Sequence, residues 1–410
     1  MTSFTSNPDN FFQTTDSIED AARKANKRNN KNGSPIKLQS KLLAVISDPD
    51  DDRYVYVAEA AGCVRRVNIE TGKINRTYTG PVAPLNCLAL STRTPRTLFA
   101  GCWDKSVWSW LCVSGKQTAR YTGHGDFVKA VTCVVVHGTE LLITGAADAV
   151  IRVWDIEANR AVSALKGHTR GILSLVVDPS TTAAAHESTG VGNGDAKDDD
   201  EDGVTLFSSD STREIRKWCI TPSSSRQLTT EPILVHETSI TQLYFPAYTD
   251  ADDPPDLYTA SADKSTLCLS RTATPAWKAD TVLAHPDFVR AVLVDGDAGV
   301  VVTACRDEEV RIWDKSSGEL VYTYSGHWEE VLGLAFARKD GVVGVVSVGI
   351  DGTVRWWGIG KGDIARAKEE ERREQEEKEG AEKEKSAEVK DGLMTEEEEA
   401  ELAALMEDSD

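Results

Sequence analysis

The sequence of 410 residues has no apolar run that approaches the ~18 residues a membrane-spanning helix needs. Its first residues, MTSFTSNPDNFF, lack the apolar stretch of a secretory signal peptide. The eight cysteines form no CxxC pair and no other spacing typical of a metal site. Cys133, Cys268 and Cys305 fall within strand-like apolar patterns, where a free buried thiol is ordinary. We therefore expect a protein of the reducing cytoplasm or nucleus that binds no metal and no cofactor.

Motifs of enzymes and of nucleic-acid-binding proteins are also missing. The chain has no glycine-rich loop that would cradle a phosphate, no nucleophile elbow, and no basic stripe with interleaved aromatic residues. The formal net charge of -20 is concentrated in two segments. Residues 361–410 hold 20 acidic and 9 basic residues, and residues 181–203 hold seven acidic residues and one lysine. The missing motifs lead us to expect no enzymatic activity. Because the remainder of the chain is about neutral, we also expect no direct binding of nucleic acid.

Short apolar runs rich in Val, Ile and Thr are what the sequence has in abundance. The stretch His124–Asp155 contains three of them, VKAVTCVVV, ELLITGA and VIRVWD. They are too short for buried helices and predict strands. A similar stretch runs from His285 to Asp314, so the sequence predicts a repeat architecture.

Seven units can be aligned by the residue that closes their third strand. These residues are Asn68, Trp110, Trp154, Trp218, Leu269, Trp313 and Trp357, with successive spacings of 42, 44, 64, 51, 44 and 44. Loop-like polar insertions at about 181–203 and about 249–256 explain the two long spacings. Without them the period is about 44 residues, which is typical of four-stranded propeller blades.

The recurring elements resemble the blades of the WD-repeat β-propeller family. They are GHGDFVKAV with VIRVWD, GHTRGIL with IRKW, HPDFVRAV with VRIWD, and GHWEEVLGL with VRWW. The resemblance covers roughly residues 36–359 and implies an all-β fold of seven blades around a central channel. It also implies that a strand within Ser34–Leu42 completes the last blade and so removes unpaired sheet edges. The expected domains are a disordered polar arm (1–35), the propeller (36–360) and an acidic, partly helical tail (361–410).

The arm and the tail each allow two interpretations. The arm carries a loose basic cluster from Arg23 to Lys31, which favours a solvated segment, with a nuclear localisation signal as the alternative. Near the end of the tail, Thr395 is expected to cap a short helix with an apolar face of Leu402, Leu405 and Met406. This face either belongs to a disordered solubilising tail or docks into a second protein partner.

A histidine, a hydroxyl residue, an aspartate and a tryptophan recur in units three, six and seven. The sets are His124, Thr144, Asp148 and Trp154; His285, Thr303, Asp307 and Trp313; and His327, Ser347, Asp351 and Trp357. Such side chains invite a catalytic triad, but an enzyme needs one site and three copies favour a structural role. In the WD-repeat family the set is a hydrogen-bonded brace, and we expect it to be complete only in these three units. In the fourth unit Thr212 occupies the aspartate position, with Asp210 nearby.

The resemblance also places three positions of each blade on the channel rim, where partners of the family bind. The candidates are Asn86, Trp103, Phe127, Lys129, Phe288, Arg290, Arg306 and Glu330. HGDFVKAV and HPDFVRAV each join an aromatic residue to a cation, and such residues dominate protein hot spots. We expect an extended peptide with acidic residues to bind here. The alternative is that both phenylalanines only shape their blades.

The sequence thus favours a non-catalytic scaffold or adaptor, cytoplasmic or nuclear, that presents a peptide-binding rim within a multiprotein complex. One alternative is an acidic chaperone or assembly factor for basic clients such as histones or ribosomal proteins, which the acidic segments would suit. Another is a substrate-presenting subunit of a ubiquitin ligase. Against the latter, Trp154-Asp155 and Trp313-Asp314 lack the arginine two residues later that one adaptor-binding class of the family uses.

Overall fold

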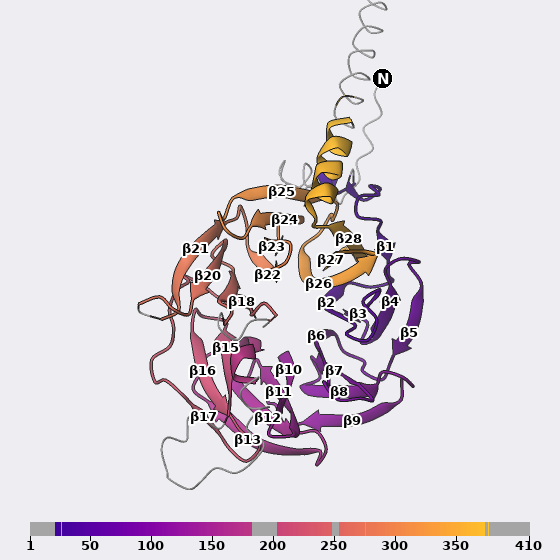
Figure 1. The fold of residues 1–410 in the computed structure, drawn as a ribbon. Coiled ribbons are helices and arrows are strands. Elements are labelled where there is room, and N and C mark those ends of the chain that lie inside the picture. Colours follow the sequence, from indigo (N-terminus) through magenta and orange to yellow (C-terminus); the bar gives the residue numbers. More distant parts are fainter. Residues whose placement is uncertain are drawn as a thin grey trace, which may run out of the picture. The chain divides into compact units, whose positions relative to one another are not determined.

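The apolar runs form 28 β-strands in the computed structural model, which describes residues 21–25, 27–182, 203–247, 254–274, 276–373 and 376. These strands make seven four-stranded sheets. Figure 1 shows the sheets arranged in a ring, with the first strand of each nearest the centre. The predicted seven-bladed β-propeller is confirmed.

The first three blades follow one another along the chain. Blade 1 consists of β2 (Leu42–Ser47), β3 (Tyr54–Glu59), β4 (Val64–Asn68) and β5 (Ile74–Tyr78). Blade 2 consists of β6 (Leu85–Leu90), β7 (Thr97–Cys102), β8 (Ser106–Leu111) and β9 (Gln117–Thr122). Blade 3 consists of β10 (Val128–Val136), β11 (Thr139–Ala146), β12 (Val150–Asp155) and β13 (Arg160–Lys166).

The last four blades continue the ring. Blade 4 consists of β14 (Ile172–Val177), β15 (Val204–Asp210), β16 (Ile215–Ile220) and β17 (Ser225–Gln227). Blade 5 consists of β18 (Ile240–Tyr244), β19 (Leu257–Ser261), β20 (Ser265–Ser270) and β21 (Lys278–Ala284). Blade 6 consists of β22 (Val289–Asp295), β23 (Val300–Cys305), β24 (Glu309–Asp314) and β25 (Leu320–Ser325). Blade 7 consists of β26 (Val331–Lys339), β27 (Val342–Gly349), β28 (Thr353–Gly358) and β1 (Ile36–Lys37).

The apolar core lies between neighbouring blades. The second strand of each blade is buried on both faces, as in β23, where all six residues are buried. Such a strand reads as a continuous apolar run because both of its faces pack against other sheets. The innermost strands instead mix buried with half-buried residues, as in β14.

Strand β1 closes the ring. Ile36 pairs with Val354 of β28 in antiparallel register. The Leu38 N–H donates to the Gly352 carbonyl at 2.8 Å, and the Leu38 side chain is buried in the apolar cluster between blades 7 and 1. The expected closure by an N-terminal strand is confirmed, and it leaves no open edge between the first and last blades.

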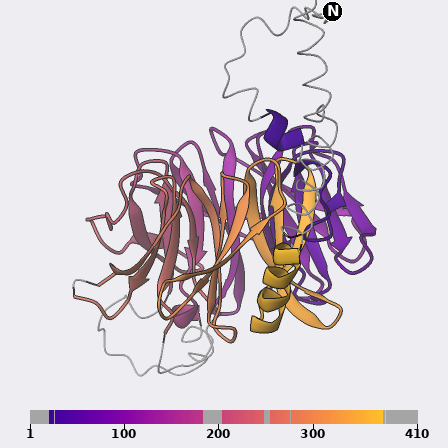
Figure 2. The same ribbon diagram turned by 90° about the horizontal axis from the view of Figure 1, so that it is seen from above.

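The described part of the arm differs from the predicted disordered segment. Residues 21–25 are helical, and Figure 2 shows this helix in indigo at one face of the ring. Arg23 and Lys27 pair with Glu308, which lies 285 residues from Arg23 in the chain. The residues around the basic cluster could not predict these ion pairs, because Glu308 is so distant in the sequence. Residues 1–20 lie outside the described part of the chain.

The chain divides after Ile359 into two units. In the second unit, residues 361–373 form a helix in which Arg373 donates to Glu369 at 3.2 Å. The expected tail docking residues Leu402, Leu405 and Met406 lie outside the described residues, as does the acidic insertion from 183 to 202. Within the described ranges, no helix has the length and apolar character that crossing a membrane requires.

Candidate protein-binding rim

Loops at one end of the blades bring five of the predicted rim residues into one ring, which we call the top face. In each blade, a backbone N–H after the second strand donates to a carbonyl just before the innermost strand. These N···O bonds of 2.8 to 3.0 Å join Ala60 to Lys41, Trp103 to Pro84, Ala147 to Phe127, Ser211 to Gly171, Ala262 to Ser239, Arg306 to Phe288, and Ile350 to Glu330. The predicted residues Trp103, Phe127, Phe288, Arg306 and Glu330 therefore occupy equivalent loop pairs.

The other three predicted residues are β-bulges in the innermost strands. In blade 3, for example, the pairing between β10 and β11 skips from Val128 to Ala130 and leaves Lys129 outside the ladder. A bulge bends its strand and re-aims the extra side chain. All seven bulge residues line one cavity of about 200 Å³ in the channel: Leu43, Asn86, Lys129, Leu173, Thr241, Arg290 and Leu332. The other four bulge residues, Leu43, Leu173, Thr241 and Leu332, were not predicted, because nothing distinguishes a bulged residue of this kind within an apolar strand.

Two aromatic residues on the top face of blades 2 and 3 form an exposed pair. The rings of Trp103 and Phe127 stack with centroids 5.2 Å apart and planes inclined by 13°. Trp103 is 42% exposed and Phe127 is 38% exposed. The loop before β6 adds Val82, which is 97% exposed. Large aromatic surface left in water at one place indicates a site that a partner covers.

Blade 6 presents its matching residues differently. The Arg306 guanidinium lies over the Phe288 ring, 5.0 Å from its centroid, and covers this half-buried side chain. Arg290 forms an ion pair with Glu330 of blade 7. By contrast, Lys129 makes no hydrogen bond or ion pair with any residue that the structure describes. The two motifs therefore differ in the folded protein. The cation of HGDFVKAV has no partner among the described residues, whereas the cation of HPDFVRAV is paired within the propeller.

The four-residue brace is continuous in blades 3 and 7. In blade 3 the His124 Nδ1 lies 3.1 Å from Asp148, and its Nε2 lies 2.8 Å from the Thr144 hydroxyl, which also accepts from the Trp154 indole at 2.9 Å. Blade 7 repeats these contacts at 2.8, 2.7 and 2.8 Å among the following residues: His327, Asp351, Ser347 and Trp357. Each network ties the loop before a blade to its second and third strands.

This geometry does not support catalysis by the brace. Burial lowers the pKa of His124, which favours a neutral imidazole. In a neutral imidazole whose Nδ1–H donates to the Asp148 carboxylate, Nε2 accepts from the Thr144 hydroxyl. Thr144 and Ser347 are fully buried, so a substrate cannot reach either hydroxyl.

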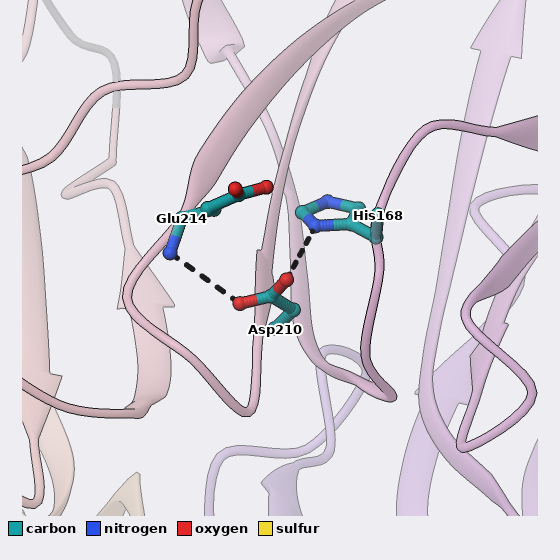
Figure 3. Close-up of side chains that lie close together, drawn as sticks. All are labelled: His168, Asp210 and Glu214. Carbon is teal, nitrogen blue, oxygen red and sulfur yellow. Dashed lines mark hydrogen bonds and ion pairs between the residues drawn. The ribbon is translucent and has the colours of Figure 1, made fainter.

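Blade 4 has a brace that the sequence alignment did not predict. Asp210, at the end of β15, lies 3.0 Å from His168 Nδ1, while Ser208 joins His168 to the Trp218 indole at 2.6 and 2.7 Å (Figure 3). Thr212, which occupies the aligned position, donates to Asp210 instead. The aspartate has moved two residues along the chain, and its side chain still reaches the histidine. The expectation that only blades 3, 6 and 7 carry a brace is therefore wrong for blade 4.

His168, Asp210 and Glu214 also form a group whose potential metal ligands all lie within 4.8 Å of one another (Figure 3). The hydrogen bonds leave little room for an ion. His168 Nδ1 lies 3.0 Å from Asp210 and Nε2 lies 2.6 Å from the Ser208 hydroxyl, so both ring nitrogens have hydrogen-bond partners. Glu214 pairs with Arg216 at 2.8 Å. The lone pairs that a metal would need are already engaged, so this group fits a structural brace.

Blade 5 keeps most of the brace without its tryptophan. His236 lies 2.8 Å from Asp263 and 2.7 Å from Thr259, as in the other blades. Leu269 stands where the indole would be, and Trp277 from the following loop fills the space between blades 4 and 5 against Phe207. The position of a large aromatic side chain is thus conserved in space, although its place in the repeat is not.

In blade 6 the brace was predicted to be complete, but the structure shows it to be incomplete. His285 Nδ1 lies 3.0 Å from the Leu283 carbonyl, not from Asp307. Two contacts of the brace remain: His285 Nε2 lies 2.8 Å from the Thr303 hydroxyl, and the Trp313 indole N–H donates to the same hydroxyl. Asp307 is held by Arg311 at 2.6 Å. The Arg311 guanidinium donates two charge-assisted hydrogen bonds to this carboxylate.

The altered brace of blade 6 predicts a dependence of stability on pH. Burial, with the nearby Arg311 charge, lowers the pKa of His285 to about 4 from 6.5. The unfolded chain therefore binds the proton first, and stability is lost as the pH falls from about 6.5 toward 4. At pH 5 the expected loss from this group is about 2 kcal/mol. In His285→Gln this contribution should vanish, so urea unfolding at pH 7 and pH 5 should show a shallower pH dependence. Parallel curves for the two proteins would contradict the assignment.

Comparisons with known proteins agree with the blade geometry. The family model described as WD domain, G-beta repeat matches residues 115–155, 278–314 and 318–358. An uncharacterized WD repeat-containing protein of Schizosaccharomyces pombe is 30% identical over 86% of this chain and 89% of its own length. A ribosome biogenesis protein WDR12 homolog of Drosophila virilis is 26% identical over 65% of this chain and 71% of its own length. Pre-mRNA-processing factor 19 of Caenorhabditis elegans is 26% identical over 48% of this chain and 34% of its own length.

Proposed function

Because this chain belongs to the WD-repeat family, we propose that it is a non-catalytic scaffold that holds protein partners on the top face of its propeller. Propellers of the family bind protein partners, and none of the relatives described above is named as an enzyme. One observation carries the proposal. The exposed stack of Trp103 and Phe127 lies beside the channel mouth, where Lys129 and the Asn86 Oδ1 have no partner among the described residues.

The chemistry of this half of the rim favours an extended segment with an apolar and an acidic residue. The aromatic pair offers a flat apolar surface to one side chain. Lys129 supplies a cation without an internal counter-ion, and the buried Asn86 Oδ1 has no hydrogen-bond donor among the described residues. A carboxylate of the partner would pair with Lys129, and a neighbouring N–H of the partner would satisfy Asn86.

Removing the aromatic pair tests the proposal. The full chain carrying Trp103→Ala and Phe127→Ala should lose at least about 30-fold, or about 2 kcal/mol, in affinity for its partners. Affinity purification with quantitative mass spectrometry identifies the partners, and titration of one purified partner gives the dissociation constants. Phe288→Ala with Arg290→Ala makes a matched pair in blade 6, where the side chains are internally satisfied, and should have the smaller effect. Equal affinity of the wild type and the Trp103 and Phe127 variant would refute the assignment.

An assembly factor for basic clients remains the second candidate. The acidic segments 181–203 and 361–410 favour it, as does similarity to a relative named for ribosome biogenesis. The names of that relative and of the pre-mRNA-processing factor also support a nuclear location. Binding to histones or ribosomal proteins that falls steeply with salt would favour this candidate over capture on the aromatic pair. A tail partner at Leu402, Leu405 and Met406 is proposed on sequence alone.

A further inference from the structure

Three carboxylates converge on the top face where blades 6 and 7 meet. Glu308 lies in the turn after β23, Glu309 is the first residue of β24, and Glu329 lies in the loop before β26. We call these three residues the acidic site. Glu308 has a positive φ of 76°, a conformation that is uncommon for a residue with a side chain. Glu330, the neighbour of Glu329, pairs with the bulge residue Arg290, so the acidic site adjoins the rim.

The acidic site already holds a basic ligand, which is the arm of the same chain. Arg23 donates to both oxygens of Glu308, at 2.7 and 3.0 Å. Lys27 bridges Glu308 and Glu309 at 3.2 and 2.6 Å, and Lys24 reaches Glu329 at 3.1 Å. The three cations lie at positions i, i+1 and i+4 of the arm, which is a spacing that one end of a helix can present.

The acidic site requires a cation. The Glu308 side chain is only 4% exposed under the arm, and burial raises the pKa of Glu309, although Lys27 opposes this rise. Adjacent carboxylates withdrawn from water are stable as anions only when charged donors pair with them. A segment that replaced the arm would consequently have to bring its own arginine or lysine residues.

The helical end of the arm is short and partly exposed to solvent. Residues 21–25 are too few to form a stable helix alone, and Arg23 remains 46% exposed. The firm anchor lies further along the chain, where Asn30 and Asn32 donate to the carbonyls of Gly326 and Ser325 at 2.7 and 3.0 Å. The helical end can therefore leave the acidic site while the anchor keeps the arm attached.

From these contacts we infer that the acidic site binds basic helical segments of partner proteins and that the arm occupies it as a displaceable ligand. The partner segment carries cations at positions equivalent to Arg23, Lys24 and Lys27. Its charge preference is opposite to that of the Trp103 and Phe127 half of the rim. The inference does not depend on the aromatic pair, so either proposal can fail alone.

A labelled synthetic peptide of residues 21–33 serves as the probe for the acidic site. Full-length protein carrying Arg23→Glu and Lys27→Glu should release its arm. Fluorescence anisotropy should then show at least about tenfold tighter binding of the peptide than to the wild type, whose tethered arm competes at a high effective concentration. Adding Glu308→Gln and Glu329→Gln to the released protein should abolish this binding.

Arg28→Glu is the matched control, because Arg28 is an exposed cation of the same arm. It should leave peptide affinity at the wild-type value. If the charge reversals prevent folding, Arg23→Ala with Lys27→Ala provides the released arm. Equal peptide affinity for a folded released variant and the wild type would overturn the inference, as would binding that persists without Glu308 and Glu329.

Discussion

Replacing His327 by alanine should lower the free energy of unfolding by about 3–5 kcal/mol. His327 is fully buried, and so is the Asp351 carboxylate that it binds. Burial alone would raise the pKa of Asp351, but hydrogen bonds from His327 and Thr353 hold it below its usual value. Without the imidazole, a buried anion and the Ser347 hydroxyl both lose a partner. Urea unfolding at pH 7, followed by tryptophan fluorescence, measures the loss.

His285→Ala in blade 6 makes the matched comparison. Asp307 is paired with Arg311 and does not depend on the histidine. The variant loses only neutral hydrogen bonds to Thr303 and the Leu283 carbonyl, and we expect a loss of about 1–3 kcal/mol. Equal destabilisation by the two substitutions would show that the aspartate contact does not distinguish the blades.

Replacing Leu38 by aspartate should open the ring. Leu38 is buried between blades 7 and 1, directly after the closing strand. The variant loses the burial of a leucine and places a carboxylate in an apolar cluster, which together cost more than about 4 kcal/mol. Detaching β1 from β28 relieves that burial, so blade 7 should be left with three strands and an unpaired edge.

Two measurements check this second expectation. The urea midpoint should fall, and size-exclusion chromatography with light scattering should show self-association through the exposed edge of β28. Gln39→Asp introduces the same charge at the next residue, whose side chain is exposed, and should behave as the wild type. A monomeric Leu38→Asp protein with an unchanged midpoint would contradict the role of β1.

Most of the fold could be predicted because six of the seven blades are built entirely from consecutive strands. The period of about 44 residues repeats in the chain, and strand pairing inside a blade joins residues close in sequence. The closing strand was predicted from the family resemblance, with the polar chain after Trp357 indicating that blade 7 lacks a fourth strand of its own. Local patterns were therefore sufficient for the first six sheets, and the seventh needed the resemblance.

The braces show where local patterns fail. The Asp210 side chain reaches His168 from two residues before the aligned position. Asp307 occupies its aligned position, yet its side chain turns to Arg311. In both cases the orientation of the carboxylate side chain decides which donor it binds. Residue identity at a fixed spacing does not predict that orientation.

The rim and the arm show a second limit. Family resemblance placed Lys129 and Arg290 at equivalent positions, but only the structure distinguishes the unpaired lysine from the arginine bound to Glu330. The acidic site was missed altogether, because Glu308 and Arg23 come from opposite ends of the propeller sequence. Contacts between the arm and blade 6 do not recur from blade to blade, so the sequence repeat does not predict them.

The pairing of β1 with β28 also sets an order in time. Ile36 leaves the ribosome first, and its partner Val354 follows only after six further blades have been made. At ~5–20 residues per second, this delay lasts roughly 15–60 s. Each earlier blade can pair its own strands as it emerges, whereas β1 waits unpaired throughout. The ring can therefore close only when synthesis is almost finished, and any blades that fold earlier form an open arc.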